Sequence, residues 1–241
     1  GSSGSGSETS GQEEYYDWLS TALEKAASQN DKIREQVDDE NNSYSERLSL
    51  QQQLLANNQQ ELELLKIANQ RRVEGWETAK QKILETFGEI EGNQLIQNIM
   101  SGNSKEGEWF SNIVGDEKKK VVDDAIQANK DLEESNDEIT EKEKENAEDI
   151  QKEFEMRKNE IKSLISEVET AMDSIQSSMS IRETSGSEII TEADYRSLIR
   201  QSKEQISLYE EQLDILYEQR DSLEENSAEW YGIQSEIASV E

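Results

Sequence analysis

The chain has 241 residues, of which 32% are hydrophobic and 33% are charged, and its formal net charge is -30 at pH 7. Such a composition is typical of disordered chains, except that the apolar residues recur at helical spacing, which predicts thin helical structure instead of a thick globular core. Cysteine, histidine and proline are all absent. Disulfides, Cys/His zinc sites and a histidine general base are therefore excluded, and long uninterrupted helices are favoured.

The net charge and the hydropathy of the chain also indicate which classes of partner it can bind. The strongly acidic balance argues against nucleic acid or anionic lipid as the main partner, because both require a basic surface. No run approaches the roughly 18 apolar residues of a membrane span. We therefore expect protein partners, no membrane contact, no cofactor or metal, no catalytic residues and no enzymatic activity.

Most of the chain is predicted to form one long antiparallel coiled-coil hairpin. Residues 1–11 begin GSSGSGS and are expected to be a flexible linker or tag remnant. The first coiled-coil arm is predicted over 12–84 and the second over 117–182. Between them, residues 85–116 hold five of the twelve glycines and a dense apolar cluster, which predicts a small helical tip.

The register of the two arms follows from their heptads and from one stutter in each arm. In a stutter, two consecutive seam residues are each separated by four positions, which we call a double step of four. Glu40, Tyr44 and Leu48 form the first double step, and Asn146, Ile150 and Phe154 form the second. The resulting pairs are Leu19 with Ile175, Ala26 with Val168, Ile33 with Ile161, Leu55 with Ile139, and Leu62 with Leu132. This register predicts a fold-back close to Gln97.

Polar residues interrupt the predicted seam. They include Gln51, Asn58, Asn69, Asn136 and Glu143. Polar seam residues favour one register at a cost in stability. We therefore expect arms that can open.

The tip contains the candidate partner contacts. Trp109, Phe110, Ile99 and Met100 form either an exposed docking surface or, as is more common for such residues, a small core that closes the tip. The only basic run, Lys118 to Lys120, is expected to meet Glu74, Trp76 and Glu77 across the hairpin in a local cluster.

Acidic residues concentrate in the second arm. Ten carboxylates lie between Asp131 and Asp149. They indicate a site for a basic partner or for cations, or else a solvated helix face, and the solvated face is the commoner case.

A second helical hairpin is predicted over 192–241, after a loop at 183–191. Thr191 is the expected N-cap of its first helix, and a turn at 225–227 caps its second helix. This hairpin is expected to be truncated, with its continuation beyond residue 241 in the native protein.

Four segments together resemble the helical regions of tail tape-measure proteins from phages and prophages of gut Gram-positive bacteria. They are YRSLIRQSKEQI at 195–206, SAEWYGIQSEI at 227–237, YYDWL at 15–19 and IMSG at 99–102. The resemblance implies a non-enzymatic structural segment that helps to determine tail length and to assemble the tail tube.

The same resemblance implies partners and a location. The partners would be tail-tube or tail-assembly proteins, with self-association of the chain also open, and the locations would be the virion tail and, during assembly, the host cytoplasm. Tape-measure proteins usually carry membrane-active segments, which this chain lacks, and a stable hairpin would halve the length that it measures. The alternative is a coiled-coil interaction module of a bacterial surface or secreted protein that binds a partner through its tip.

Overall fold

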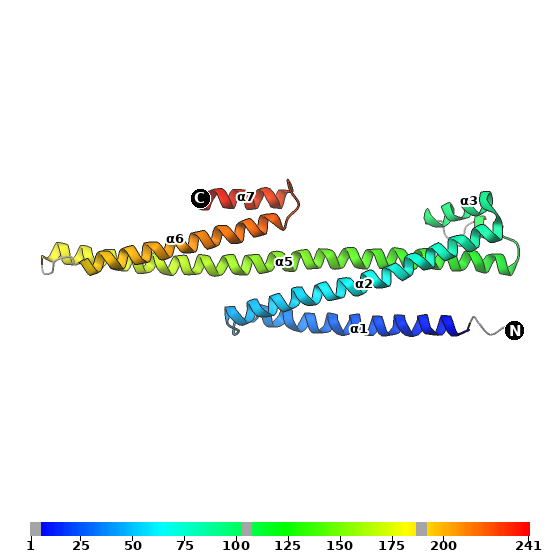
Figure 1. Ribbon diagram of the computed structural model, residues 1–241, viewed down its shortest axis with the longest axis horizontal. Coiled ribbons are helices and arrows are strands. Elements are labelled where there is room, and N and C mark those ends of the chain that lie inside the picture. Colours follow the sequence, from blue (N-terminus) through cyan, green and yellow to red (C-terminus); the bar gives the residue numbers. More distant parts are fainter. Residues whose placement is uncertain (1–5, 103–107, 187–191) are drawn as a thin grey trace. The chain divides into compact units, whose positions relative to one another are not determined.

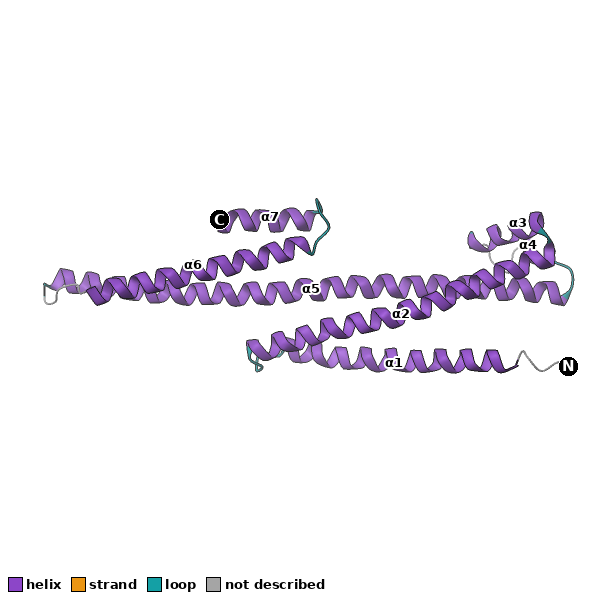
Figure 2. Cartoon of the chain, viewed as in Figure 1, coloured by secondary structure: helices purple, strands orange, loops and turns teal. Residues whose placement is uncertain are grey.

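The computed structural model describes residues 6–102, 108–186 and 192–241, and these residues form helices joined by short connections, with no strand among them (Figures 1 and 2). The helices are α1 (Gly6–Asp38), α2 (Tyr44–Phe87), α3 (Glu89–Met100), α4 (Glu108–Ser111), α5 (Asp116–Ser185), α6 (Glu192–Asp221) and α7 (Ala228–Val240). The predicted all-α class with helical hairpins is confirmed. Helix α1 begins inside the predicted linker 1–11, whose first five residues lie outside the described residues.

The chain divides into two compact units. Unit 1 comprises Gly1–Glu35 and Gln53–Ala147, and unit 2 comprises Gln36–Gln52 and Glu148–Glu241. Each unit therefore contains segments from opposite arms of the predicted hairpin.

The predicted first arm, 12–84, is not one helix. A turn at 39–43 separates α1 from α2, and the backbone N–H of Asn42 donates to the carbonyl of Asp39 at 3.1 Å. Ser43 then caps α2, because its Oγ accepts a hydrogen bond from the backbone N–H of Glu46 at 3.2 Å. The predicted coiled-coil stutter in this region is thus a turn, and Ser43 and Glu46 have the spacing of a capping box.

Because of this turn, α1 packs against α2 in unit 1. Asn57 of α2 donates to Asn30 of α1 at 3.1 Å, and Asn30 donates to Glu61. The predicted pairing of Ile33 with Ile161 is therefore wrong. In unit 2, Ile161 packs instead with Ile165 and Ile215.

The predicted register between α2 and α5 is also wrong. Lys142 forms an ion pair with Glu61 at 2.8 Å, and Arg72 forms one with Asp131 at 3.2 Å. Residue 142 thus lies where Leu132 was expected beside Leu62. The ends of α2 at Phe87 and of α5 at Asp116 lie close to the predicted bounds of the tip, whereas Gln97, the predicted fold-back, lies inside α3.

The tip of unit 1 has a compact apolar core. Gly88 ends α2 with a φ of 84°, a conformation that glycine adopts without strain, and α3 follows directly. The buried members of the core come from four segments and are Trp76, Ile83, Leu95, Ile96, Ile99, Ile113, Val122 and Ala125. This core holds α3 against the ends of α2 and α5.

Two helical glycines are predicted to respond oppositely to alanine. A Cβ on Gly92 would lie 3.2 Å from the backbone Cα of Leu84, whereas a Cβ on Gly75 would meet nothing within 4 Å. We expect Gly92→Ala to destabilise unit 1 by about 1–3 kcal/mol, because α3 must move away from α2. Gly75→Ala should stabilise α2 by roughly 0.5–1 kcal/mol. Urea unfolding followed by circular dichroism measures both, and equal effects of the two substitutions would contradict the close approach of α3.

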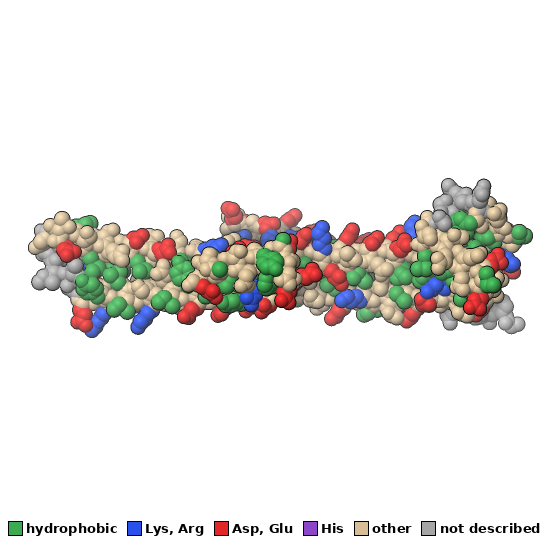
Figure 3. All heavy atoms as spheres, turned by 90° about the horizontal axis from the view of Figure 1, so that it is seen from above, with side chains coloured by type: hydrophobic (Ala, Val, Ile, Leu, Met, Phe, Trp, Pro, Cys, Tyr) green, Lys and Arg blue, Asp and Glu red, His purple; other side chains and the backbone are tan. Residues whose placement is uncertain are grey.

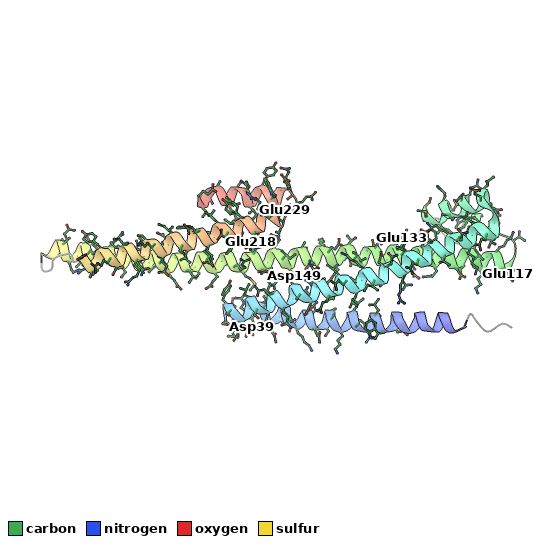
Figure 4. The ribbon with its side chains drawn as sticks, in the orientation of Figure 1. Asp39, Glu117, Glu133, Asp149, Glu218 and Glu229 are labelled. Atoms are coloured by element: carbon green, nitrogen blue, oxygen red, sulfur yellow. The ribbon has the colours of Figure 1, made fainter. Side chains whose placement is uncertain are left out.

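Unit 2 contains the C-terminal part of α5 with α6 and α7. Arg157 of α5 donates to Glu218 of α6 at 3.0 Å (Glu218 is labelled in Figure 4), and Leu216 of α6 packs with Ile233 and Ile237 of α7. The predicted cap at 225–227 is confirmed, because Ser227 Oγ accepts a hydrogen bond from the backbone N–H of Trp230 at 3.1 Å. The predicted cap at Thr191 lies outside the described residues.

A lysine is buried among the helices of unit 2. Lys158 is 1% exposed and forms ion pairs with Glu155 at 2.7 Å and Glu236 at 3.1 Å. Burial alone would raise the pKa of Glu155, but hydrogen bonds from Lys158 and Gln219, together with the charge of Lys158, lower this pKa below its ordinary value. Glu155 is therefore ionised at neutral pH and helps to neutralise the buried ammonium group.

Candidate functional site

The predicted partner contacts at the tip lie mostly in its core. Ile99 is buried, and Trp109 and Phe110 are half-buried against the core, with their rings 6.0 Å apart in an edge-to-face arrangement. Met100, with 59% of its surface exposed, protrudes from the end of α3. Three of the four residues thus contribute to closing the tip, and their role as partner contacts stays a prediction.

The basic run near the tip has a different neighbour from the expected one. The ammonium of Lys118 lies 5.4 Å from the ring centre of Phe87. Trp76 instead has Lys80 of its own helix over its ring at 5.5 Å, and Lys80 also pairs with Glu77 at 2.7 Å. The shift follows from the corrected register, which places the start of α5 beside the end of α2.

A groove lies among α1, α2 and α5 in unit 1, with a volume of about 710 Å³. We call it the unit 1 groove. Its lining residues are Asp17, Leu19, Ser20, Leu23, Glu24 and Ala27 of α1, Glu61, Leu65, Ala68 and Arg72 of α2, and Asp131, Glu134, Ser135, Glu138, Glu141, Lys142 and Glu145 of α5. This volume falls within the range of ligand sites in proteins.

Apolar side chains of α1 and α2 form the floor of the unit 1 groove. Leu19, Leu23 and Ala27 follow one another at intervals of four residues along α1, and Leu65 and Ala68 lie on α2. Residues four apart share one face of a helix, so the three α1 residues form one continuous stripe. Ala27 and Ala68 have smaller side chains than the three leucines.

Carboxylates of α5 form the rim of the groove. Glu134, Glu138 and Glu141 are all exposed, and their spacing places them on one face of α5. Glu133, labelled in Figure 4, marks the level of α5 at which this rim begins. Figure 3 shows that acidic side chains also lie elsewhere along the chain, so the rim differs from them by its position beside an apolar floor.

A buried polar network closes one end of the groove. Lys142 pairs with Glu61 at 2.8 Å and also with Glu145 at 3.7 Å, and Arg34 of α1 donates to Glu145. Asn30, which is 1% exposed, connects α1 to Glu61. The network therefore ties all three helices together at this end.

The charge of the groove is strongly negative. Eight of its lining residues are acidic and two are basic. Both basic groups are already paired, Arg72 with Asp131 and Lys142 with Glu61. The carboxylates of the rim consequently create an unneutralised negative potential over the apolar floor.

The described residues contain no cluster of three or more Asp or Glu side chains arranged to hold a metal ion.

The acidic stretch from Asp131 to Asp149 is visible in the sequence, whereas the groove is not. The groove requires α1 to lie beside α2 and α5, which follows from the turn at 39–43. The spacing of Ser43 and Glu46 was the available signal for that turn.

Comparisons with protein-family models, with curated proteins and with solved structures found no match to this chain. Within the described ranges, no helix is both long enough and apolar enough to cross a membrane. The class that the fold and groove define is thus an all-α protein of packed helical hairpins with an acidic, apolar-floored groove.

Proposed function

We propose that the chain is a non-enzymatic structural segment of a phage or prophage tail tape-measure protein, which takes part in setting tail length and assembling the tail tube. The support from the sequence is its resemblance to that family at 195–206 and 227–237, segments that belong to α6 and to the start of α7. Its partners would be tail-tube or tail-assembly proteins in the host cytoplasm and in the virion tail.

The observation that carries this proposal is the polarity of the contacts between helices. Five polar or charged side chains are buried between helices. They are Asn30 and Lys142 in unit 1, and Gln51, Lys158 and Gln219 in unit 2. Such contacts specify one arrangement but stabilise it less than apolar packing would. We propose that the helices separate along these polar contacts, outside the apolar core of the tip.

Opening of the hairpins reconciles the folded structure with a measuring role. A helix extends by about 1.5 Å per residue, so helices folded back on one another span less length than the same residues arranged end to end. We propose that the packed form precedes assembly and that the segment extends inside the tail tube.

The test is tail length after deletion of residues 192–241 from the gene in the phage that carries it. An extended helical segment predicts tails shorter by about 75 Å, at roughly 1.5 Å for each deleted residue. Electron microscopy of purified tails measures this length. The control is the full-length chain with Glu204→Gln, which should give tails of unchanged length, and tails of unchanged length in the deletion would refute the proposal.

A disulfide lock tests the opening separately. The chain has no cysteine, and the side chains of Asn69 and Asn136 meet at 2.7 Å between α2 and α5. We expect the Asn69→Cys/Asn136→Cys variant to assemble shorter or fewer tails when oxidised and normal tails when reduced. Normal tails carrying the intact cross-link would show that this hairpin stays closed.

A partner-binding module is the second candidate. The unit 1 groove favours it, whereas the burial of Ile99 and the packing of Trp109 and Phe110 weigh against binding through the tip. This candidate predicts a loss of partner binding, without a change of tail length, when the groove is altered.

A further inference from the structure

We propose that the unit 1 groove binds a basic amphipathic helix, whose apolar face packs on the groove floor and whose Lys or Arg side chains pair with the rim carboxylates. This binding site goes beyond the structural role proposed above and does not depend on it. Such a helix would pack beside α1, α2 and α5 as a fourth helix.

The floor of the groove matches the apolar face of a helix. From Leu19 through Leu23 to Ala27, α1 rises by about 12 Å, or roughly two helical turns. Amphipathic helices that bind grooves insert side chains at i, i+3 or i+4, and i+7, which also extend over two turns. Ala27 and Ala68 provide the space into which larger apolar side chains of the incoming helix would insert.

The rim determines the charge of the incoming helix. Glu134, Glu138 and Glu141 repeat every three or four residues along α5, so they can meet basic side chains on successive turns of an adjacent helix. An acidic helix would be repelled by the same carboxylates. A second copy of this chain, with a net charge of -30, therefore fits the groove poorly.

The probe is a fluorescent peptide of about 18 residues, or five helical turns, built from Leu and Lys with leucine at i, i+3, i+4 and i+7. One control peptide has the same composition in an order that gives no apolar face. Fluorescence anisotropy with the full chain measures both affinities. We expect the amphipathic peptide to bind at least about tenfold more tightly than the control, and to bind more weakly as salt screens the rim.

Substitutions in the rim test where the peptide binds. In the variant Glu134→Gln/Glu138→Gln/Glu141→Gln, affinity should fall by about tenfold, because three exposed ion pairs are lost. The matched control, Glu204→Gln/Glu210→Gln/Glu224→Gln, changes the net charge equally at exposed sites in unit 2. It should change affinity by less than about twofold, since charges beyond a Debye length are screened.

Filling the groove tests the apolar floor. Ala27 is exposed on α1, so Ala27→Trp should occupy the groove while leaving the helices packed, and should abolish peptide binding. Ala193→Trp, at an exposed position in α6, is the control and should bind normally. Circular dichroism establishes that each variant is folded.

Three results would overturn the proposal. The first is equal affinity for the amphipathic and control peptides, and the second is an equal loss of affinity in the rim variant and its unit 2 control. The third is a dimer in sedimentation velocity that Ala27→Trp dissociates, because the groove would then be covered by a second copy of the chain. None of these results bears on tail length, which tests the structural role independently.

Discussion

Replacing Lys142 with alanine is expected to lower the free energy of unfolding of unit 1 by about 3–5 kcal/mol, because Glu61 would stay buried without its counter-charge. Both side chains are less than 10% exposed, and their ion pair at 2.8 Å joins α2 to α5. The amide of Asn30 in α1 would still donate to this carboxylate. Urea unfolding monitored by circular dichroism gives the change in free energy.

Two control variants distinguish the cost of leaving a buried charge unpaired from the effect of removing any lysine from α5. Lys144→Ala removes an exposed lysine from the same turn of α5 and should change stability by less than about 0.5 kcal/mol. The double variant Glu61→Leu/Lys142→Leu should lose less stability than Lys142→Ala, because it leaves no buried unpaired charge, although the buried amide of Asn30 loses its acceptor. A loss in Lys142→Ala no greater than in Lys144→Ala would show that the pair is hydrated.

The ion pair of Lys142 with Glu61 also affects how readily the hairpin opens in the proposed mechanism. If the double leucine variant is more stable, the natural ion pair has been retained at the expense of stability. The same variant, placed in the tail-length experiment, should then open less readily and hinder assembly.

Ile83→Ala is expected to destabilise the tip of unit 1 by about 2–5 kcal/mol. Ile83 is completely buried in the core that holds α3 against the ends of α2 and α5, and its truncation leaves a cavity there. Fluorescence of Trp76 and Trp109, which both contact this core, reports its unfolding.

The control for this substitution lies on α3 itself. Ile90 is 82% exposed, so Ile90→Ala should change stability by no more than about 0.5 kcal/mol. Similar losses in the two variants would contradict the position of α3 in the tip.

Several features of the fold follow from short stretches of sequence. The helical period of the apolar residues and the absence of proline predict an all-helical chain, because both act within a few turns of one helix. The cap at Ser227 is equally local, since it depends on a hydrogen bond to a backbone N–H three residues away. The acidic rim of α5 was likewise visible as a run of carboxylates between Asp131 and Asp149.

The choice of partners for each helix required longer-range information. A heptad repeat shows which face of a helix is apolar. It does not fix the register, because a partner helix shifted by seven residues would pack on nearly the same apolar face. The contact of Lys142 with Glu61 selects one register, yet a lysine in an acidic stretch resembles a solvated residue until its partner is known.

Composition and periodicity thus predict a helical, acidic chain built from hairpins with polar seams. The turn of α1 at 39–43, the filling of the tip by α3 and α4, and the groove among α1, α2 and α5 become visible only when the helices are packed together. Helix formation depends on interactions within a few residues. The groove depends on the packing of three helices from distant parts of the chain, and polar contacts such as Asn30 with Asn57 select that packing.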